Sequence, residues 1–128
     1  MKILIIDDDM RNIFALTAVL KAKKIQTVSA LSVPEAMTIL TTDNDISLIL
    51  LDIMMPDIDG FQAIRMIKAD ERISDLPIIA VTAKAMEGDR KKCLEAGAND
   101  YISKPVDISR LMQMISEYLS LQNVQRVR

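Results

Sequence analysis

The chain has 128 residues, half of them hydrophobic, which suits one globular domain with a core of its own. Its formal net charge of -2 argues against a surface for nucleic acid or anionic membranes, and no apolar run approaches the roughly 20 residues of a membrane span. The single cysteine, Cys93, and the absence of histidine exclude an intrachain disulfide, a multi-cysteine zinc site, a Ser-His-Asp triad, a histidine-liganded metal and a phosphohistidine on this chain. The N-terminus has no signal-peptide pattern, so we expect a cytoplasmic protein.

The beginning of the chain predicts a strand, an acidic turn and a helix. Residues 3–6 form a short apolar run, typical of a strand that is buried on both faces. The turn Asp7-Asp8-Asp9 follows, and apolar residues then recur at helical spacing to about Ala22. Either Asp8 or Asp9 could cap this helix.

The middle of the chain continues the alternation of strands and helices. A weaker, partly alternating strand covers residues 25–30, and a helix begins near Ser32. Residues 48–51 are all apolar, which predicts a strand inside a parallel sheet with Asp52 at its carboxyl end. Gly60 opens the helix that follows.

The next strand and helix carry polar residues at their junction. The strand covers residues 78–81 and ends in Thr82 and Ala83. The helix, at about residues 86–96, has a thin apolar stripe, so we expect it to be the least firmly anchored of the helices. Its basic run, residues 90–92, is interpreted as a solvated face.

A last strand and helix close the predicted domain. The short strand at residues 101–102 leads to Lys104, and apolar spacing marks a helix over residues 108–119. We therefore expect a domain at residues 1–121 and a polar C-terminal tail at residues 122–128. An output domain for DNA binding or enzymatic work is not expected.

Five strands that alternate with five helices predict an α/β fold. It is a three-layer sandwich with helices on both faces of a parallel sheet, because each crossover is right-handed. The pattern does not fix the strand order, but of the two common orders the flavodoxin-like 2-1-3-4-5 is the smaller. In that order the first and third strands are neighbours, so Asp7, Asp8 and Asp52 meet at one edge of the sheet. Thr82 and Lys104 arrive there from the next two strands.

This constellation of side chains predicts phosphoryl chemistry supported by a metal. Crowded carboxylates repel one another, and burial raises their pKa values unless a cation is present. Oxygen ligands without imidazole or thiolate select Mg²⁺, with Mn²⁺ as an alternative. Lys104 supplies a positive charge and Thr82 supplies a hydroxyl group, and both can contact phosphoryl oxygens. A carboxylate can accept a phosphoryl group when a metal ion and a lysine neutralise the charge on that group. Each residue alone has an ordinary structural explanation, and their joint placement at four strand ends favours the functional one.

Four motifs carry a resemblance to a known family. They are Ile5-Ile6-Asp7-Asp8-Asp9, Leu51-Asp52-Ile53-Met54-Met55-Pro56 with Gly60 downstream, Val81-Thr82-Ala83, and Asp100-Tyr101-Ile102-Ser103-Lys104-Pro105. Over nearly its whole length the chain resembles the receiver domains of two-component signalling. The resemblance implies a phosphoacceptor domain that receives a phosphoryl group from a sensor histidine kinase or a histidine phosphotransfer protein. It implies no enzymatic activity beyond the domain's own phosphorylation and dephosphorylation.

The resemblance also implies roles for the acidic residues. Asp52 would be the phosphoacceptor. Mg²⁺ would be held by Asp7, Asp8, Asp52 and the backbone carbonyl of Met54. Met54 and Lys84 flank this site and are expected to influence how fast water reaches the phosphorylated carboxylate.

Further roles concern the phosphoryl group and the response to it. By resemblance, Thr82, the backbone of Ala83 and Lys104 would contact the phosphoryl group, and the Lys104-Pro105 peptide would be cis. Thr82 and Tyr101 would form a switch that reorders the face of the fourth helix, fifth strand and fifth helix, where a downstream protein would bind.

Two longer stretches narrow the expected subfamily. Residues 10–16 and 83–94 resemble receivers attached to hybrid sensor histidine kinases and some single-domain regulators. Because Met1 stands directly before the first strand, we expect a stand-alone protein, with an excised domain of a hybrid kinase as the alternative. The surface around Met10, Ile13 and Phe14 is expected to dock the phosphodonor.

Three other functions are weighed against this interpretation. A haloacid-dehalogenase-like phosphatase would use the first carboxylate of the pair Asp7 and Asp9 as its nucleophile, but Arg11 stands where that family has a threonine or valine, and its late acidic pair is missing. A flavodoxin-type cofactor carrier would need a phosphate-binding loop after the first strand, which the sequence lacks. An interaction module that works without phosphorylation is the third alternative.

Overall fold

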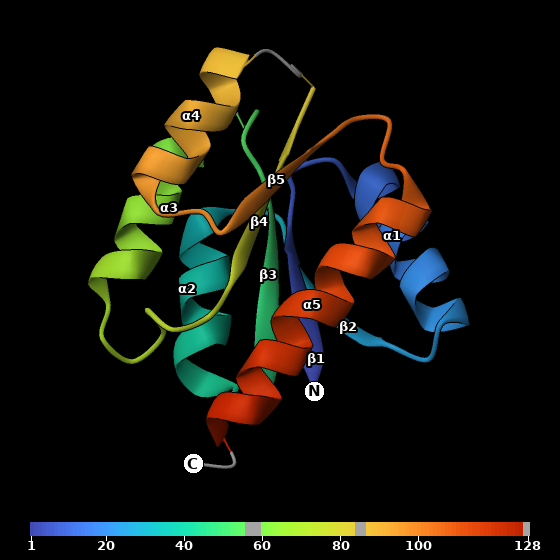
Figure 1. The fold of residues 1–128 in the computed structure, drawn as a ribbon, viewed down its shortest axis with the longest axis horizontal. Coiled ribbons are helices and arrows are strands. Elements are labelled where there is room, and N and C mark those ends of the chain that lie inside the picture. The colour runs from blue at the N-terminus through green and yellow to red at the C-terminus, as the bar shows by residue number, and fades with distance from the viewer. Residues whose placement is uncertain (56–59, 84–86, 127–128) are drawn as a thin grey trace.

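The computed structural model describes residues 1–55, 60–83 and 87–126, the last seven of these and residues 87–89 by their backbone only. Strands and helices alternate along the whole chain (Figure 1). The strands are β1 (Lys2–Ile6), β2 (Gln26–Ala30), β3 (Ile46–Asp52), β4 (Ile78–Thr82) and β5 (Asp100–Ser103). The helices are α1 (Met10–Ala22), α2 (Val33–Thr42), α3 (Gly60–Ala69), α4 (Glu87–Ala96) and α5 (Ile108–Arg126).

The five strands form one parallel sheet in the order β2-β1-β3-β4-β5. This is the flavodoxin-like order expected from the sequence, so the fold prediction is confirmed. β3 lies at the centre, and all seven of its residues are buried, as its uninterrupted apolar pattern indicated. β1 and β3 are direct neighbours, with Ile6 aligned to Leu51, so the residues that follow both strands emerge side by side.

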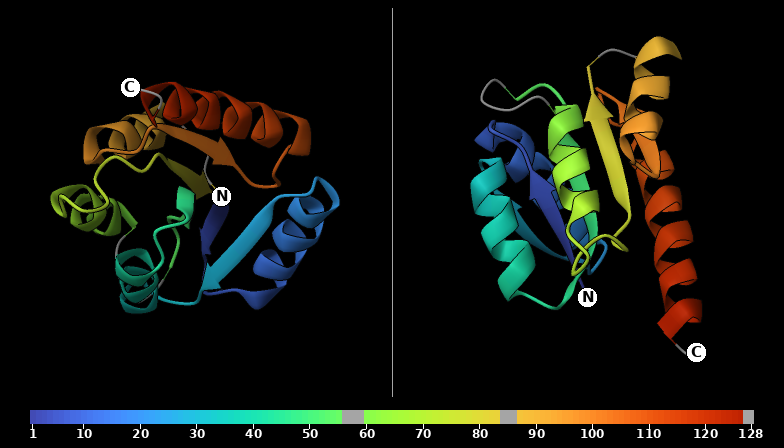
Figure 2. Two further views of the ribbon diagram at one scale, coloured as in Figure 1. Left: turned by 90° about the horizontal axis from the view of Figure 1, so that it is seen from below. Right: turned by 90° about the vertical axis from the view of Figure 1, so that its left-hand side faces the viewer.

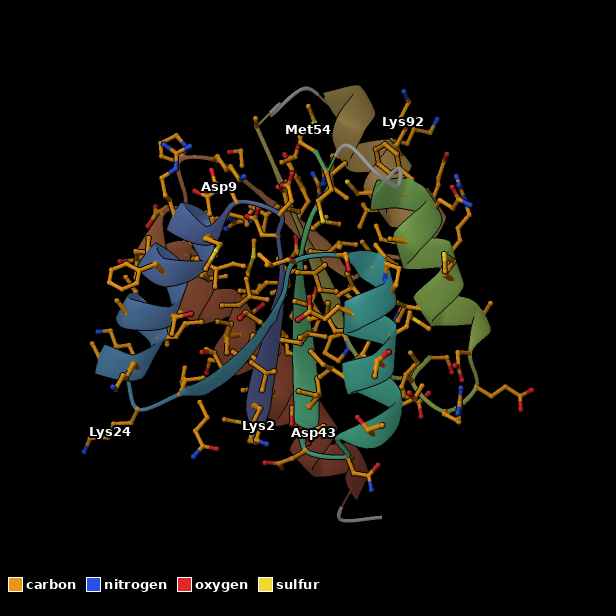
Figure 3. The ribbon with its side chains drawn as sticks, turned by 180° about the vertical axis from the view of Figure 1, so that it is seen from behind. Lys2, Asp9, Lys24, Asp43, Met54 and Lys92 are labelled. Atoms are coloured by element: carbon orange, nitrogen blue, oxygen red, sulfur yellow. The ribbon has the colours of Figure 1, made fainter. Side chains whose placement is uncertain are left out.

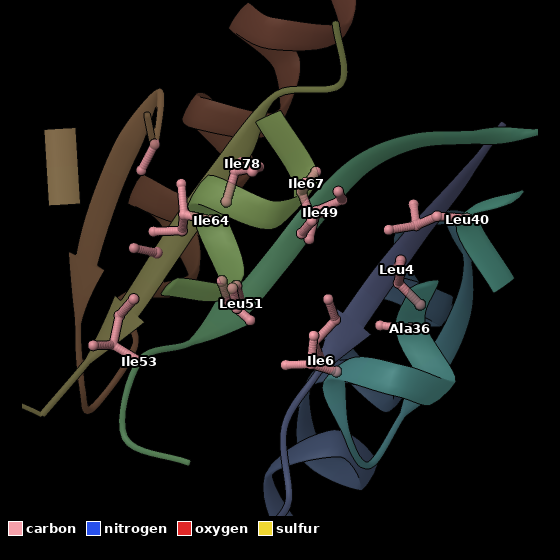
Figure 4. Packing of buried hydrophobic residues seen from close by; sticks show 14 of the residues in the cluster. Leu4, Ile6, Ala36, Leu40, Ile49, Leu51, Ile53, Ile64, Ile67 and Ile78 are labelled. Carbon is pink, nitrogen blue, oxygen red and sulfur yellow. The ribbon is translucent and has the colours of Figure 1, made fainter. Parts of the chain in front are cut away.

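Helices cover both faces of the sheet and give the molecule two cores. α2, α3 and α4 pack on one face and α1 and α5 on the other (Figure 2). Because successive side chains of a strand point to opposite faces, alternate residues of one strand enter different cores. Leu4 and Ile6 face α2 and α3 (Figure 4), whereas Ile3 and Ile5 face α1 and α5.

The helix boundaries follow recognisable capping residues. Asp9 is the N-cap of α1 and accepts a hydrogen bond from the amide of Arg11. The hydroxyl of Ser32 accepts one from Glu35 at the start of α2. Gly97 has φ +120° directly after α4, in the region that favours glycine. Of the two candidate caps for α1, the structure therefore selects Asp9.

Two predicted boundaries differ from the structure or lie outside it. α5 continues to Arg126, so most of the segment expected to be a tail is helical. The physical reason is that residues 122–126 contain no glycine or proline to end the helix. The predicted start of α4 at Met86 lies outside the described residues.

The anchoring of α4 is thin, as its sequence indicated. Of its residues whose side chains are described, only Cys93 and Ala96 are buried. α1 is also lightly anchored, because Leu20 is its one fully buried residue, so the ranking of α4 as least anchored stays a prediction. In the described part of the chain, no helix combines the length and hydrophobicity needed to span a bilayer.

Candidate functional site

The candidate site lies at the edge of the sheet where the strands end. Turns that follow strands and lead into helices gather at this end of the molecule (Figure 1). Asp9 and Met54 mark the same end in Figure 3, and Lys2 and Asp43 mark the opposite end. In parallel α/β sheets, ligands bind at the carboxyl ends of the strands. The acids and the lysine singled out in the sequence, Asp7, Asp8, Asp52 and Lys104, all lie at this edge of the sheet, which we call the functional edge.

Three carboxylates converge between β1 and β3. Asp7 and Asp52 are buried, at 3% and 4% exposure, whereas Asp8 is exposed. One carboxylate oxygen from each of the three lies within 4.8 Å of the others. The amide of Asp9 donates to Oδ1 of Asp7 at 2.9 Å, and the amide of Met54 donates to Oδ1 of Asp52 at 3.0 Å. Backbone amides thus orient both buried carboxylates.

Burial has an electrostatic consequence for Asp7. The pKa of this carboxyl is raised from 3.8 to about 6, mainly by burial and in smaller part by the negative charge of Asp52. The backbone amide of Asp9 and the ammonium group of Lys104 lower the pKa of Asp7, but they do not offset the desolvation. The sequence-based expectation that crowding and burial raise carboxyl pKa values is therefore confirmed for Asp7.

Lys104 brings positive charge to the two buried acids. Its Nζ lies 3.5 Å from Oδ2 of Asp52 and 3.9 Å from Oδ2 of Asp7. The amide of Lys104 donates to the carbonyl oxygen of Thr82 at 2.7 Å, which ties the end of β5 to the end of β4. The peptide between Lys104 and Pro105 is cis, as expected.

Thr82 and Tyr101 lie on the same face of the sheet. Tyr101 is aligned with Ala80 of β4, and Thr82 follows Ala80 by two residues, so all three side chains point toward α4. Thr82 is buried and Tyr101 is half-buried. Ala83 is exposed directly after β4. The structure thus places the two expected switch residues on one face of two neighbouring strands.

Several other residues of interest lie around the acids. Met54 is 52% exposed beside Asp52, and Lys84 lies outside the described residues, as does Pro56. On α1, Met10 and Phe14 are 70% and 77% exposed, which suits a docking surface. Ile13 is partly buried, because it also packs against the core between α1 and α5.

A cavity of about 260 Å³ adjoins the carboxylates on the α1 and α5 side of the sheet. It is lined mainly by apolar side chains from α1 and from the segment after β5, including Leu16, Val19 and Val106. Asp7, Asn12, Asp52 and Lys104 form its polar part. The cavity therefore places a mainly apolar surface next to the two buried acids.

The donor set fits a hard divalent cation. Three carboxylate oxygens stand close enough to share one ion, and no thiolate or imidazole is among them. Mg²⁺ is bound in proteins by few carboxylates and several waters, which matches two buried acids and one exposed acid. The raised pKa of Asp7 is also what a site built for a cation shows in the cation's absence.

Comparison with known proteins places these features in a family. The family model for the response regulator receiver domain matches residues 3–116. The polar-differentiation response regulator DivK of Brucella ovis is 33% identical over 117 residues, which cover 91% of this chain and 94% of DivK. The chain belongs to the response regulator receiver domain family. It is a receiver domain of two-component signalling, and the phosphatase alternative is not favoured, because Asp9 caps α1 instead of joining the acidic cluster.

Two solved receiver domains resemble this one closely. The receiver domain of a Pseudomonas aeruginosa sensor histidine kinase has a TM-score of 0.83 and 32% identity, with 93% of this chain and 97% of that chain covered. That structure is described with a magnesium ion coordinated in the active site cleft. The Saccharomyces cerevisiae Ssk1 receiver, solved with the phosphotransfer protein Ypd1, has a TM-score of 0.86 and 29% identity, with 95% and 90% covered. Receiver domains bind Mg²⁺ in this acidic pocket, and their partners are histidine kinases or phosphotransfer proteins.

Sequence reasoning missed the structural role of one residue that shapes the site. Gly60 was noted as the start of a helix and as part of the Asp52 motif, but a Cβ atom there would lie 2.6 Å from Cα and 2.8 Å from the carbonyl oxygen of Ile53. Ile53 directly follows Asp52. The glycine therefore allows α3 to approach the backbone next to the carboxylate. Its position after the Asp52 motif was the only signal in the sequence.

The raised pKa of Asp7 predicts a pH dependence of magnesium binding. A cation must displace the proton that Asp7 holds below about pH 6. We expect the apparent dissociation constant for Mg²⁺ to be constant above pH 7 and to rise by up to about tenfold per pH unit below pH 6. Isothermal titration calorimetry in buffers from pH 5 to pH 8 measures this profile. A constant affinity down to pH 5 would contradict the role of Asp7.

Proposed function

We propose that this receiver domain accepts a phosphoryl group on Asp52 from a phosphohistidine of its partner. The observation that carries the proposal is the cluster itself, in which oxygens of Asp7, Asp8 and Asp52 lie within 4.8 Å of one another and Nζ of Lys104 lies 3.5 Å from Asp52. An acid in this setting has both a cation site and a fixed positive charge beside it. These are the groups that phosphoryl transfer to a carboxylate requires.

The proposed transfer forms one bond and breaks one. An oxygen of Asp52 attacks the phosphorus, the bond between phosphorus and the imidazole nitrogen breaks, and the imidazole leaves with the bonding electron pair. The nitrogen then takes a proton from solvent. Lys104 attracts the phosphoryl oxygens, because its Nζ already lies beside Asp52, and the Thr82 hydroxyl and the Ala83 amide are the further donors we assign to them.

The chain would hold Mg²⁺ through Asp7, Asp8 and Asp52, with the backbone carbonyl of Met54 as a further ligand. Mn²⁺ has the same preference for oxygen and is expected to substitute. When bound, the cation neutralises charge on the transferred phosphoryl group. The residues themselves orient the acceptor, because the amides of Asp9 and Met54 fix the carboxylates of Asp7 and Asp52.

The phosphodonor is proposed to dock on α1, near the functional edge. Met10 and Phe14 offer exposed apolar surface there, and the cavity between α1 and α5 continues it toward Asp52. Large apolar side chains exposed together on one surface are typical of interaction sites. We assign the domain to the cytoplasm, where histidine kinases have their catalytic parts.

The output is proposed to lie on the face of α4, β5 and α5. Thr82 would turn toward the phosphoryl oxygens and Tyr101 would move inward, which shifts the population between two packings of this face. The light anchoring of α4 by Cys93 and Ala96 supports this assignment, because weakly held elements reorder at low cost. The only chemistry we assign to the domain is its own phosphorylation and dephosphorylation.

The decisive experiment locates the phosphoryl group. The protein is incubated with Mg²⁺ and acetyl phosphate, and the labelled residue is identified by mass spectrometry. We expect wild type to be modified at Asp52 and Asp52→Asn to remain unmodified, with Asp45→Asn, an exposed acid at the other end of the sheet, labelled like wild type. Equal labelling of Asp52→Asn would refute the proposal, and modification at Asp7 would support a phosphatase-type nucleophile.

A further inference from the structure

Arg90 contacts the ring of the expected switch tyrosine. The guanidinium carbon of Arg90, on α4, lies over the ring of Tyr101 at 5.8 Å from its centroid. Arg90 is exposed and Tyr101 is half-buried, so the guanidinium covers the ring from the solvent side. This distance is within the range of cation–π attraction. The sequence had indicated no more than a solvated basic face at residues 90–92.

The neighbours of Tyr101 on β4 are a small residue and the expected switch threonine. Its aligned neighbour on β4 is Ala80, a small and fully buried residue, and Thr82 lies on the same face two residues further along. The ring is therefore a diagonal neighbour of Thr82 across a small side chain. Movement along this face toward Thr82 would take the ring away from the guanidinium at the surface.

We propose that Arg90 is a positioning residue. Its guanidinium holds the ring of Tyr101 near the surface and so favours the packing of the unphosphorylated domain. The inference rests on the proposed Thr82 and Tyr101 switch and deepens it by naming a residue that sets its balance. The attraction exists only while the ring lies beneath the guanidinium. It therefore stabilises the packing that the structure shows and is lost when the ring moves inward.

The neighbours of Arg90 show that the contact is not a property of every basic residue on α4. Lys91 is exposed and its Nζ lies 3.9 Å from the carboxylate of Glu95, four residues further along the helix. Arg90 forms no ion pair within the part of the chain that the structure describes. A planar guanidinium stacks on an aromatic face better than a lysine ammonium does. Lys91→Met is thus a matched control for Arg90→Met.

The test follows Tyr101 directly. The full chain is labelled with 3-fluorotyrosine, which reports only Tyr101 and Tyr118, and the two signals are assigned with Tyr118→Phe. Mg²⁺ with beryllium fluoride, a phosphoryl analogue, is titrated while the ¹⁹F shift of Tyr101 is recorded. We expect the midpoint to fall about two- to fivefold in Arg90→Met, the effect of removing one exposed cation–π contact, and to stay unchanged in Lys91→Met. Arg90→Lys should lie between wild type and Arg90→Met.

The outcomes separate this inference from the function on which it rests. If wild type and Arg90→Met share one midpoint while the Tyr101 signal moves in both, Arg90 does not set the balance and the inference is overturned. If the Tyr101 signal of wild type does not move although Asp52 is phosphorylated in the labelling experiment, the switch itself is refuted and Arg90 loses its proposed role with it. Because Arg90 is exposed, these substitutions leave the fold intact.

Discussion

Asp7→Asn is expected to stabilise the metal-free domain and to weaken its binding of Mg²⁺. The folded protein raises the pKa of Asp7 from 3.8 to about 6, so an ionised Asp7 at pH 7 opposes folding. Asparagine resembles the protonated acid and keeps an oxygen for the amide of Asp9. We expect the free energy of unfolding at pH 7, measured by urea denaturation without Mg²⁺, to rise by about 1 to 3 kcal/mol.

The sign of this effect depends on pH in a defined way. A carboxyl whose pKa is raised on folding binds its proton more tightly in the folded state. Its unfavourable contribution is therefore absent below about pH 4 and complete above about pH 6. The advantage of Asp7→Asn over wild type should accordingly disappear as the pH falls from 6 to 4. Equal stability differences at pH 4 and pH 7 would show that charge is not the cause.

Addition of Mg²⁺ should narrow the stability difference between Asp7→Asn and wild type. A ligand present at 100 times its dissociation constant stabilises the folded state by about 2.7 kcal/mol. Wild type gains this stabilisation. We expect Asp7→Asn to bind Mg²⁺ at least about tenfold more weakly, so it gains less. Asp8→Asn is the matched control, because Asp8 is exposed: it should lose affinity for Mg²⁺ without the gain in stability. An Asp7→Asn protein that gains as much as wild type from Mg²⁺ would contradict the proposed site.

The strand ends were predictable because local pattern and fold rules agree there. The uninterrupted apolar run before Asp52 indicated a central buried strand, and parallel strands put their carboxyl ends at one edge. Asp7, Asp52 and Lys104 therefore had to meet once the strand order was right. The raised pKa of Asp7 followed from the same placement, since burial and a second acid act in the same direction.

Other features depend on distances between elements that are remote in sequence, and no local pattern reports them. The contact of Arg90 with Tyr101 joins α4 to β5, and the basic run around Arg90 looks like any solvated helix face. The end of α5 was missed because residues 122–126 are mostly polar, like a tail, yet contain no glycine or proline to end the helix.

Gly60→Ala is expected to be strongly destabilising and to impair phosphorylation. The added Cβ would lie 2.6 Å from Cα and 2.8 Å from the carbonyl oxygen of Ile53, and these are backbone atoms that cannot rotate away. We expect a loss of about 2 to 4 kcal/mol in the free energy of unfolding, measured by urea denaturation. Helix propensity alone would predict the opposite sign, because alanine is favoured over glycine by about 1 kcal/mol.

The functional effect of this substitution follows from the place of Ile53 in the chain. Asp52 precedes it, and the amide of Met54, which follows it, donates to Oδ1 of Asp52 at 3.0 Å. A shift of the Ile53 backbone therefore moves both the acceptor carboxylate and the amide that orients it. Displacements of about 1 Å can slow a positioned reaction by about 100-fold, so labelling by acetyl phosphate should fall at least about tenfold at temperatures where the variant is folded.

Two control substitutions identify the backbone contact as the cause. Gln62→Ala, on the exposed face of α3, changes the same helix without approaching Ile53 and should leave stability and labelling near wild type. Ile53→Ala combined with Gly60→Ala removes the Cδ1 atom of Ile53, which would lie 2.9 Å from the new Cβ, but leaves Cα and the carbonyl oxygen in place. Full recovery in the double variant would mean that the side chain of Ile53 limits the approach of α3. Continued loss would mean that glycine is needed because the two backbones meet beside the phosphoacceptor.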